Sequence, residues 1–171
     1  NPTINIQGLT DGTIYTGSVT PTININDLNL ASTNILLDGN TYNSGTPITN
    51  TLHHNLTINA TDKAGNQATQ EILFTIIPNG GVIITDAGGT ANSGSTNLNF
   101  PNGALDEDTV ITMNDISGTS NPANFLFAGH AFDITAVNLH DGSQTNQLNQ
   151  PVLITFHYLD SDIAGLEENT L

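Results

Sequence analysis

The chain has 171 residues, which is room for one large domain or two small ones. Its charge is one-sided, with 16 acidic residues, one basic residue and a formal net charge of −15. Nucleic-acid binding needs Lys and Arg to neutralise phosphates, so this composition excludes it, and an anionic membrane surface would repel the chain for the same reason. Because Cys is absent, disulfides and thiolate metal sites are excluded as well.

The polarity of the chain comes from uncharged residues. Only 10% of residues are charged, while Thr, Asn, Ser and Gly are frequent, as in many secreted bacterial or archaeal surface proteins. No apolar run approaches the roughly 20 residues that span a bilayer. There is no signal peptide, and the first residue is Asn rather than Met. We therefore expect an excised or mature segment of an exported protein, without direct membrane insertion.

The first half of the chain is predicted to form short β-strands separated by turns. Residues 3–6 alternate in polarity, and so do residues 21–26, with Ile23 and Ile25 on one face. Residues 34–37 precede Asp38-Gly39, a pair that favours the positive φ angles of a type I′ hairpin turn. A strand over 56–61, a turn over 62–66 and a strand over 67–77 follow. About seven short strands at this spacing predict a β-sandwich, with helices a minor element.

Several motifs of the first half occur in a characteristic order. The chain begins "NPTINIQGLTDG" and continues with "SGTPITN", "LTINATDKAGNQAT" and "EILFTI", of which "ATDKAGN" is the most specific. In this order residues 1–77 resemble the bacterial immunoglobulin-like repeat of exported proteins. The resemblance implies a spacer or stalk module, usually in tandem, of adhesins, surface-layer proteins and secreted glycosidases. The stretch "TLHHNL" departs from the family, which usually has a Gly-containing turn there.

A domain boundary is predicted at residues 78–81, Pro-Asn-Gly-Gly, which form a short breaker run. We expect domains over 1–77 and 82–171 with this run as the linker. In the second domain strands are expected over 81–85, 110–113, 132–135 and 152–158, with a Gly/Ser/Thr-rich loop over 86–95 and a turn or short helical turn after residue 159. The fold class is thus all-β, with two β-sandwich domains in tandem, the first immunoglobulin-like.

The second half contains "FPNGALDEDTVITM", "GHAFDIT" and "QPVLITFHYLDSDIAGLEENTL". With these motifs residues 81–171 are similar to the β-sandwich domain shared by ankyrins, netrin receptors and zonula-occludens proteins. Some eukaryotic members cleave themselves at a His-Phe-Ser site. The comparable stretch here is His157-Tyr158-Leu159, with Ser161 displaced, so self-cleavage is not carried over.

The sequence offers no catalytic signature. None of its five His residues lies in one, and His53-His54 is expected to be a loop pair rather than a metal site. Acidic residues that are neighbours on a turn point in different directions, so no acid/base pair of a glycosidase is predicted. The absence of Trp is unfavourable for stacking on sugars. We expect a protein that is not an enzyme.

Calcium is the one cofactor that the sequence keeps open, because Ca²⁺ prefers carboxylate and carbonyl oxygens. The candidate ligands are Asp106, Glu107 and Asp108, then Asp160 and Asp162, with Asp62 as a third position. None of them has EF-hand spacing. The alternative, which the sequence favours, is that these acids are solvated and cap turns.

Two further expectations concern the surface. Asn55-Leu56-Thr57 and Asn59-Ala60-Thr61 are N-glycosylation sequons whose Asn residues lie on the outward register of a strand. Because one Lys can form few salt bridges, we also expect like-charge crowding to raise many carboxyl pKa values, so that mild acid stabilises the fold.

The functional hypothesis is a non-catalytic structural or adhesive segment of a larger extracellular surface protein, such as a surface layer, stalk or filament. The alternative is an accessory spacer or binding region of a secreted polysaccharide-degrading enzyme. Expected partners are neighbouring domains or copies of the same protein, and cell-surface glycans are a further open possibility.

Overall fold

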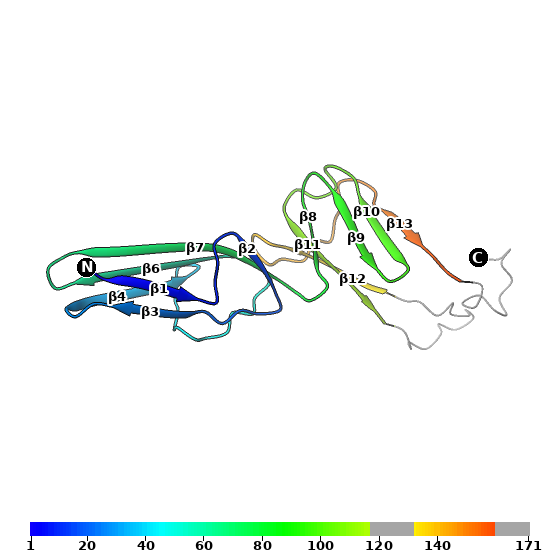
Figure 1. Ribbon diagram of the computed structural model, residues 1–171. Coiled ribbons are helices and arrows are strands. Elements are labelled where there is room, and N and C mark those ends of the chain that lie inside the picture. Colours follow the sequence, from blue (N-terminus) through cyan, green and yellow to red (C-terminus); the bar gives the residue numbers. More distant parts are fainter. Residues whose placement is uncertain (117–131, 160–171) are drawn as a thin grey trace. The chain divides into compact units, whose positions relative to one another are not determined.

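A computed structural model of the chain describes residues 1–116 and 132–159. Every regular element in these residues is a β-strand, which confirms the all-β fold class. The chain divides into two compact units, unit 1 (Asn1–Asn79) and unit 2 (Gly80–Leu171) (Figure 1). The expected turn after residue 159 lies outside the described residues. Within the described ranges there is no helix with the length and apolar character to span a membrane.

Unit 1 is built from a two-stranded and a five-stranded sheet. The small sheet pairs β1 and β3 antiparallel, and the large one has the order β2-β7-β6-β4-β5, in which only β2 runs parallel to its neighbour β7. Their bounds are β1 Thr3–Gln7, β2 Thr13–Thr16, β3 Thr22–Asn26, β4 Leu30–Leu37, β5 Asn40–Thr41, β6 His53–Asp62 and β7 Gln67–Ile77.

The core of unit 1 follows from the period of two in its strands. In β6, Leu56 and Ile58 are fully buried, whereas the intervening Thr57 lies at the surface of the sheet. Ile23 of β3 pairs with Ile6 of β1, and both belong to this core. Burying an aliphatic side chain stabilises a fold by about 1.5–3 kcal/mol, so the alternation places most of the stabilising residues between the sheets.

The hairpin predicted at Asp38-Gly39 is confirmed by its backbone angles. Asp38 has φ 51° and Gly39 has φ 77°, and a type I′ turn requires positive φ at both positions. Asp38 is the only residue other than Gly with positive φ in the described part of the chain. Leu37 and Asn40, which flank the turn, are paired across β4 and β5.

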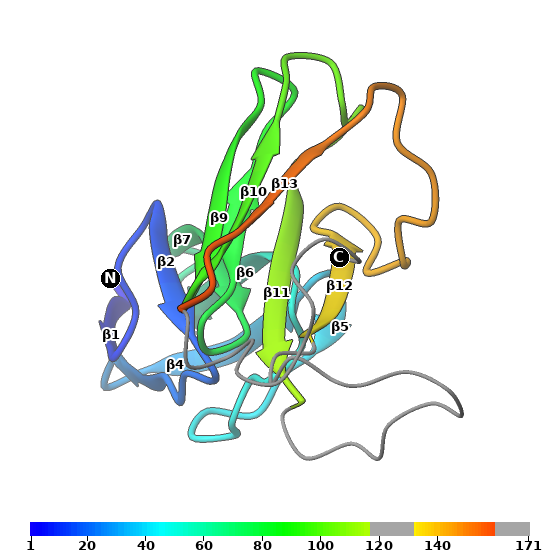
Figure 2. The ribbon, with the colours of Figure 1, turned by 90° about the vertical axis from the view of Figure 1, so that its right-hand side faces the viewer.

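Unit 2 contains two three-stranded antiparallel sheets, β12-β11-β8 and β13-β10-β9. Figure 2 shows β10 between β9 and β13. The bounds are β8 Val82–Ile84, β9 Gly89–Ser93, β10 Thr96–Phe100, β11 Thr109–Asp115, β12 Phe132–Asn138 and β13 Leu153–Phe156. Apolar side chains of both sheets, among them Leu98 and Ile111, pack in one cluster.

The sequence predicts a loop over residues 86–95, but this prediction is wrong for Gly89–Ser93, which form the strand β9. This segment, Gly-Thr-Ala-Asn-Ser, has a single buried apolar residue, Ala91, and so shows no apolar alternation. Its strand geometry comes from backbone pairing with β10. The turn before it depends on Gly88, which has φ 85°. A Cβ at that position would lie 2.4 Å from the carbonyl oxygen of Phe100.

Candidate functional site

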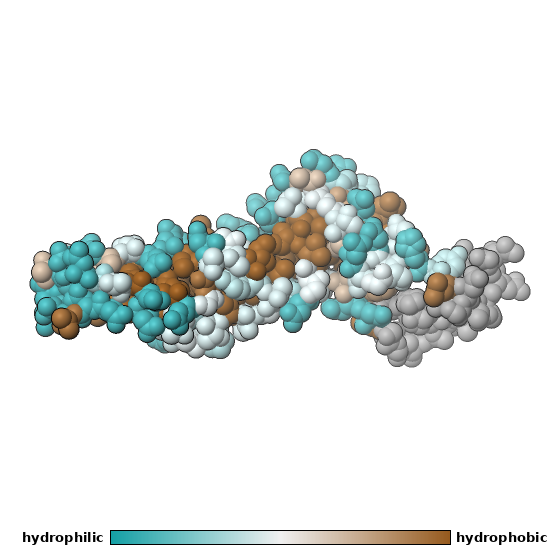
Figure 3. Space-filling view, in the orientation of Figure 1, coloured by the Kyte–Doolittle hydropathy of each residue, from teal (hydrophilic) through white to brown (hydrophobic). Residues whose placement is uncertain are grey.

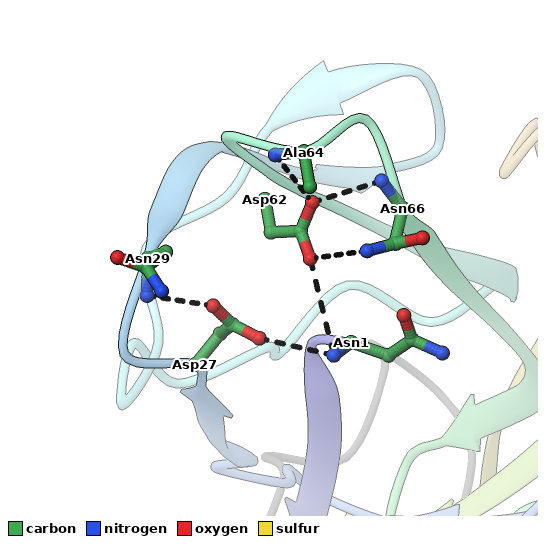
Figure 4. A network of polar contacts seen from close by, with 6 residues as sticks. All are labelled: Asn1, Asp27, Asn29, Asp62, Ala64 and Asn66. Atoms are coloured by element: carbon green, nitrogen blue, oxygen red, sulfur yellow. Dashed lines mark hydrogen bonds and ion pairs between the residues drawn. The ribbon is translucent and has the colours of Figure 1, made fainter.

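The motif "ATDKAGN" forms a turn held by one carboxylate. Asp62 Oδ1 accepts hydrogen bonds from the backbone N–H groups of Ala64 and Asn66, each at 2.9 Å. Asp62 Oδ2 accepts a third bond, of 2.7 Å, from the side-chain amide of Asn66 (Figure 4). The Asp62 residue is only 6% exposed. The Asp and Asn of this motif therefore have a role in forming the turn.

A second carboxylate lies beside this turn. Asp27 Oδ1 accepts a 2.7 Å bond from Asn29 N–H, and Asp27 Oδ2 lies 3.4 Å from the Asn1 nitrogen (Figure 4). The same nitrogen is 3.9 Å from Asp62 Oδ2. The backbone N–H of Lys63 donates to Asn29 O at 2.8 Å. These contacts join the β6–β7 turn to the segment between β3 and β4.

Two carboxyl pKa values run against the expectation of acid stabilisation. The hydrogen bond from the Asn66 side chain, followed by those from the Asn66 and Ala64 backbones, lowers the pKa of Asp62. In unit 2 the Ser143 side chain, and then its backbone N–H, lowers the pKa of Asp141. At these two groups hydrogen bonds to the ionised form outweigh the desolvation that would raise the pKa, so neither shows the rise expected of many carboxyl groups.

His53 and His54 lie at the start of β6, so the expectation of a loop pair is wrong. His54 is 3% exposed and stacks on the Phe74 ring at 5.1 Å. Its Nδ1 lies 2.7 Å from Asp38 Oδ2, and its Nε2 lies 2.9 Å from Asn50 O. Asp38 Oδ1 also accepts a 2.8 Å bond from Asn55 N–H.

The His54 cluster is a structural clamp between the hairpin turn and the segment before β6. Sequence reasoning missed it, because Asp38 and His54 are 16 residues apart. The strand register was the signal that could have found it. Leu37 pairs with Leu56, which places the turn beside residues 54 and 55. His53 makes a separate contact, of 2.7 Å, with the hydroxyl of Thr75, a residue that is 7% exposed.

The calcium candidates in unit 2 are exposed and partly bonded to the protein. Asp106 Oδ1 accepts a 2.8 Å bond from the Asn149 side chain. The Glu107 carbonyl accepts a 2.9 Å bond from the Thr109 hydroxyl, and the Asp108 carbonyl accepts one of the same length from Leu139 N–H. Residues 1–116 and 132–159 contain no group of three or more His, Asp or Glu side chains that could hold a metal ion.

Calcium binding at Asp106, Glu107 and Asp108 is therefore untested, and solvated acids remain the favoured interpretation. Asp160 and Asp162 lie outside the described residues. The sequon residues do have the expected outward register, since Leu56 and Ile58 point into the core between them. Asn55 donates a 2.6 Å bond to Glu71 Oε1, and Asn59 Oδ1 accepts a 2.9 Å bond from Thr69.

Unit 2 also has an apolar groove between its sheets, with a volume of about 440 Å³. Its floor contains the buried side chains of Leu98, Phe100 and Ile111, and its walls include Ile134 of β12 and Ile154 of β13. The remaining lining residues are Asp133, Thr135, Ala136, Gln144, Thr145, Asn146, Leu148 and Val152. Among the described strands, β12 and β13 are the edge strands that border this groove.

No protein-family model, curated protein or solved structure matches this chain. The resemblances of the two halves therefore depend on their sequence motifs.

Proposed function

We propose that the chain is a non-catalytic structural or adhesive segment of a larger extracellular surface protein. The proposal depends on the hydrogen bonds that the Asp62 carboxylate accepts within its turn. The most specific residues of the stalk-module motif close a turn through three hydrogen bonds, so the motif has an architectural role.

The order of strands in unit 1 supports the immunoglobulin-like interpretation. β1 and β2 are consecutive in the chain but belong to different sheets, and β2 runs parallel to the last strand, β7. The N-terminal segment thus passes from the small sheet in β1 to the large sheet in β2, which is a feature of many immunoglobulin-like sandwiches. This topology agrees with the motif resemblance of residues 1–77, and together they favour a spacer or stalk module.

The surface supports an extracellular location. Figure 3 shows hydrophilic residues over much of unit 1, interspersed with hydrophobic patches. The chain has one basic residue, Lys63, so trypsin-like proteases have a single cleavage site. The backbone N–H of Lys63 is bonded to Asn29 O, and the neighbouring Asp62 holds the turn closed. Such a chain suits surroundings that are rich in proteases.

The complete reading frame around this segment tests the proposal. Further β-domains and an anchoring signal in the same protein are expected, whereas an adjoining catalytic domain would favour the accessory region of a polysaccharide-degrading enzyme. Antibodies raised against the chain provide a second test. They should label intact cells or the culture medium, and labelling that requires permeabilised cells would contradict the proposal.

A further inference from the structure

The sequence contains two Asn-Gly pairs, Asn79-Gly80 and Asn102-Gly103, and both lie in turns. The side-chain amide of an Asn can be attacked by the backbone nitrogen of the residue that follows it, which closes a cyclic imide. Gly in the second position favours this attack, because Gly has no Cβ to hinder it. In a folded protein the reaction also depends on how firmly the turn holds the attacking nitrogen. The two pairs differ in this respect.

The Asn102-Gly103 turn is held by backbone hydrogen bonds. Gly103 N–H donates to Asp86 O at 2.7 Å, and the following Ala104 N–H donates to Pro101 O at 3.1 Å. The first of these bonds occupies the nitrogen that would attack Asn102. Gly103 is also half-buried, and Ala104 after it is buried. The Gly103 nitrogen can therefore react only after the turn opens and its bond to Asp86 breaks.

The Asn79-Gly80 turn lacks this protection. Both residues are exposed, and Gly80 has φ 76°. Among the described residues no acceptor is hydrogen-bonded to Gly80 N–H, and none of them forms a hydrogen bond with the Asn79 side-chain amide. A Cβ on Gly17 would lie 3.4 Å from Asn79 Oδ1, so the amide lies beside a residue that has no side chain to hold it. Both the attacking nitrogen and the group it attacks are free to react.

The Asp-Gly pairs of the chain, which can form the same imide, are less reactive. An Asp carboxyl is ionised at neutral pH, and the negative charge of a carboxylate resists attack by a nucleophile. Gly12 N–H also donates to Leu73 O at 2.7 Å, and Gly142 N–H donates to a backbone carbonyl at 2.9 Å. In the third pair both oxygens of the Asp38 carboxylate are engaged in hydrogen bonds. Asn79 is therefore the most reactive of these positions. The three pairs are Asp11-Gly12, Asp38-Gly39 and Asp141-Gly142.

We propose that Asn79 is a modification site, at which the folded protein deamidates spontaneously. The Gly80 nitrogen attacks Asn79 Cγ and forms the imide, and the side-chain nitrogen leaves as ammonia together with the proton of Gly80 N–H. Water, the co-reactant, then opens the ring at either carbonyl. One opening gives Asp, and the other gives isoaspartate, in which the backbone continues through the former side chain. This modification goes beyond the proposed function and does not depend on it.

The modified residue lies at the boundary of the two units, since Asn79 is the last residue of unit 1 and Gly80 is the first of unit 2. Each product adds a negative charge to a chain whose formal net charge is already −15. Isoaspartate also lengthens the backbone between β7 and β8 by a carbon atom. Neither strand contains the site, because β7 ends at Ile77 and β8 begins at Val82. We therefore expect the modified chain to keep both folds and to differ in charge and in the length of this connection.

Mass spectrometry of the whole chain, incubated at mildly alkaline pH, tests the proposal. A protease that cleaves before Asp separates Asn79 from Asn102 at Asp86, so the deamidation of each can be followed in its own peptide. In the folded chain Asn79 should deamidate at least about tenfold faster than Asn102, and in concentrated urea the two rates should become similar. The rate at Asn79 should also rise with pH, because the attacking nitrogen must lose its proton.

Asn79→Gln and Asn102→Gln are the matched variants, because a Gln side chain must close a larger ring and does so far more slowly. Asn79→Gln should remove most of the deamidation of the folded chain, whereas Asn102→Gln should change it little. Hydroxylamine provides a second measurement. It attacks the imide, displaces the Gly nitrogen and so cleaves the chain, and it should cut the folded protein after Asn79. Circular dichroism of each variant checks that the fold is retained.

Two results would overturn the proposal. Equal rates at Asn79 and Asn102 in the folded chain would show that the hydrogen bond of Gly103 gives no protection. An Asn79 that reacts in urea but not in the folded chain would show that the turn holds this pair in an unreactive geometry.

Discussion

The two units differ in how completely they bury the inward-facing residues of their sheets. In unit 1 the inward residues of the central strand β6, Leu56 and Ile58, have no exposed surface. In unit 2 the inward residues of β12 and β13 remain accessible, with Ile134 at 41% and Ile154 at 45%. The residue types are alike, so the difference in exposure depends on the strands that neighbour them.

Position within the sheet explains the difference. β6 has strands on both sides, β7 and β4, whereas β12 and β13 are the last described strands of their sheets. An aliphatic residue in an edge strand is covered from one side only. The comparison teaches that the same alternating pattern gives a closed core in a central strand and an accessible apolar surface at an edge.

The largest expected effect is a difference in stability loss when one Ile in the core of each unit is replaced by Ala. Ile58→Ala should lower the free energy of unfolding of unit 1 by about 3 kcal/mol, because it leaves a cavity in a fully buried position. Ile154→Ala should cost unit 2 about 1 kcal/mol, since much of that side chain is already in water. Urea unfolding of the whole chain, followed through NMR signals of each unit, gives both values. Equal costs would contradict the contrast between a closed and an open core.

The next effect concerns the clamp of unit 1. Asp38→Ala removes the acceptor for Asn55 N–H and for His54 Nδ1, and leaves a buried imidazole without its carboxylate. We expect a loss of about 2 kcal/mol in urea unfolding. Asp86→Ala, at an exposed position of unit 2, is the control and should have little effect. A similar loss in both variants would show that the clamp does not stabilise unit 1.

Proteolysis measures the opening of the "ATDKAGN" turn. Trypsin has one site in the chain, after Lys63. Asp62→Ala removes three hydrogen bonds of the turn, so cleavage should become several-fold faster than in the unchanged protein. Asp11→Ala is the control, because the Asp11 carboxylate accepts a hydrogen bond from Leu73 N–H outside this turn. An unchanged rate for Asp62→Ala would mean that the carboxylate does not hold the turn closed.

The pH dependence compares one aspartate in each unit. The folded pKa of Asp62 and that of Asp141 are depressed, so each contributes stability above its unfolded pKa and loses it as pH falls through its folded pKa. Urea midpoints should therefore fall from pH 5 toward pH 2, with the loss beginning near the usual Asp pKa of about 4. Asp62→Asn should flatten the profile of unit 1 and leave that of unit 2 unchanged. A urea midpoint that rises as the pH falls would instead support the expectation that like-charge crowding raises carboxyl pKa values.

The smallest expected effect is that of calcium on unit 2. Because Asp106, Glu107 and Asp108 are exposed, we expect the same melting temperature in chelator and in millimolar calcium. A ligand that bound only the folded state would raise it by mass action. A rise that Asp106→Asn abolishes would instead establish the calcium site, and Asp86→Asn controls for the change in net charge.

The sequence by itself determined the local geometry. Alternation identified Ile23 and Ile25 as one face of a strand, and Asp38-Gly39 predicted the type I′ turn, because these properties depend on neighbouring residues alone. The all-β class followed from the number and spacing of such segments. The 78–81 breaker run was likewise visible as local composition.

Only the tertiary structure decided which distant residues meet. The strand nature of Gly89–Ser93 comes from pairing with β10, and the His54–Asp38 contact comes from the register of β4 and β6. The direction of the Asp62 pKa shift depends on the donors that the folded turn supplies, which net charge does not reveal. Whether an apolar strand is central or at an edge is also a property of the assembled sheet. The exposure of β13 could therefore not be inferred from the letters "LITF", whose pattern would suit a buried strand equally well.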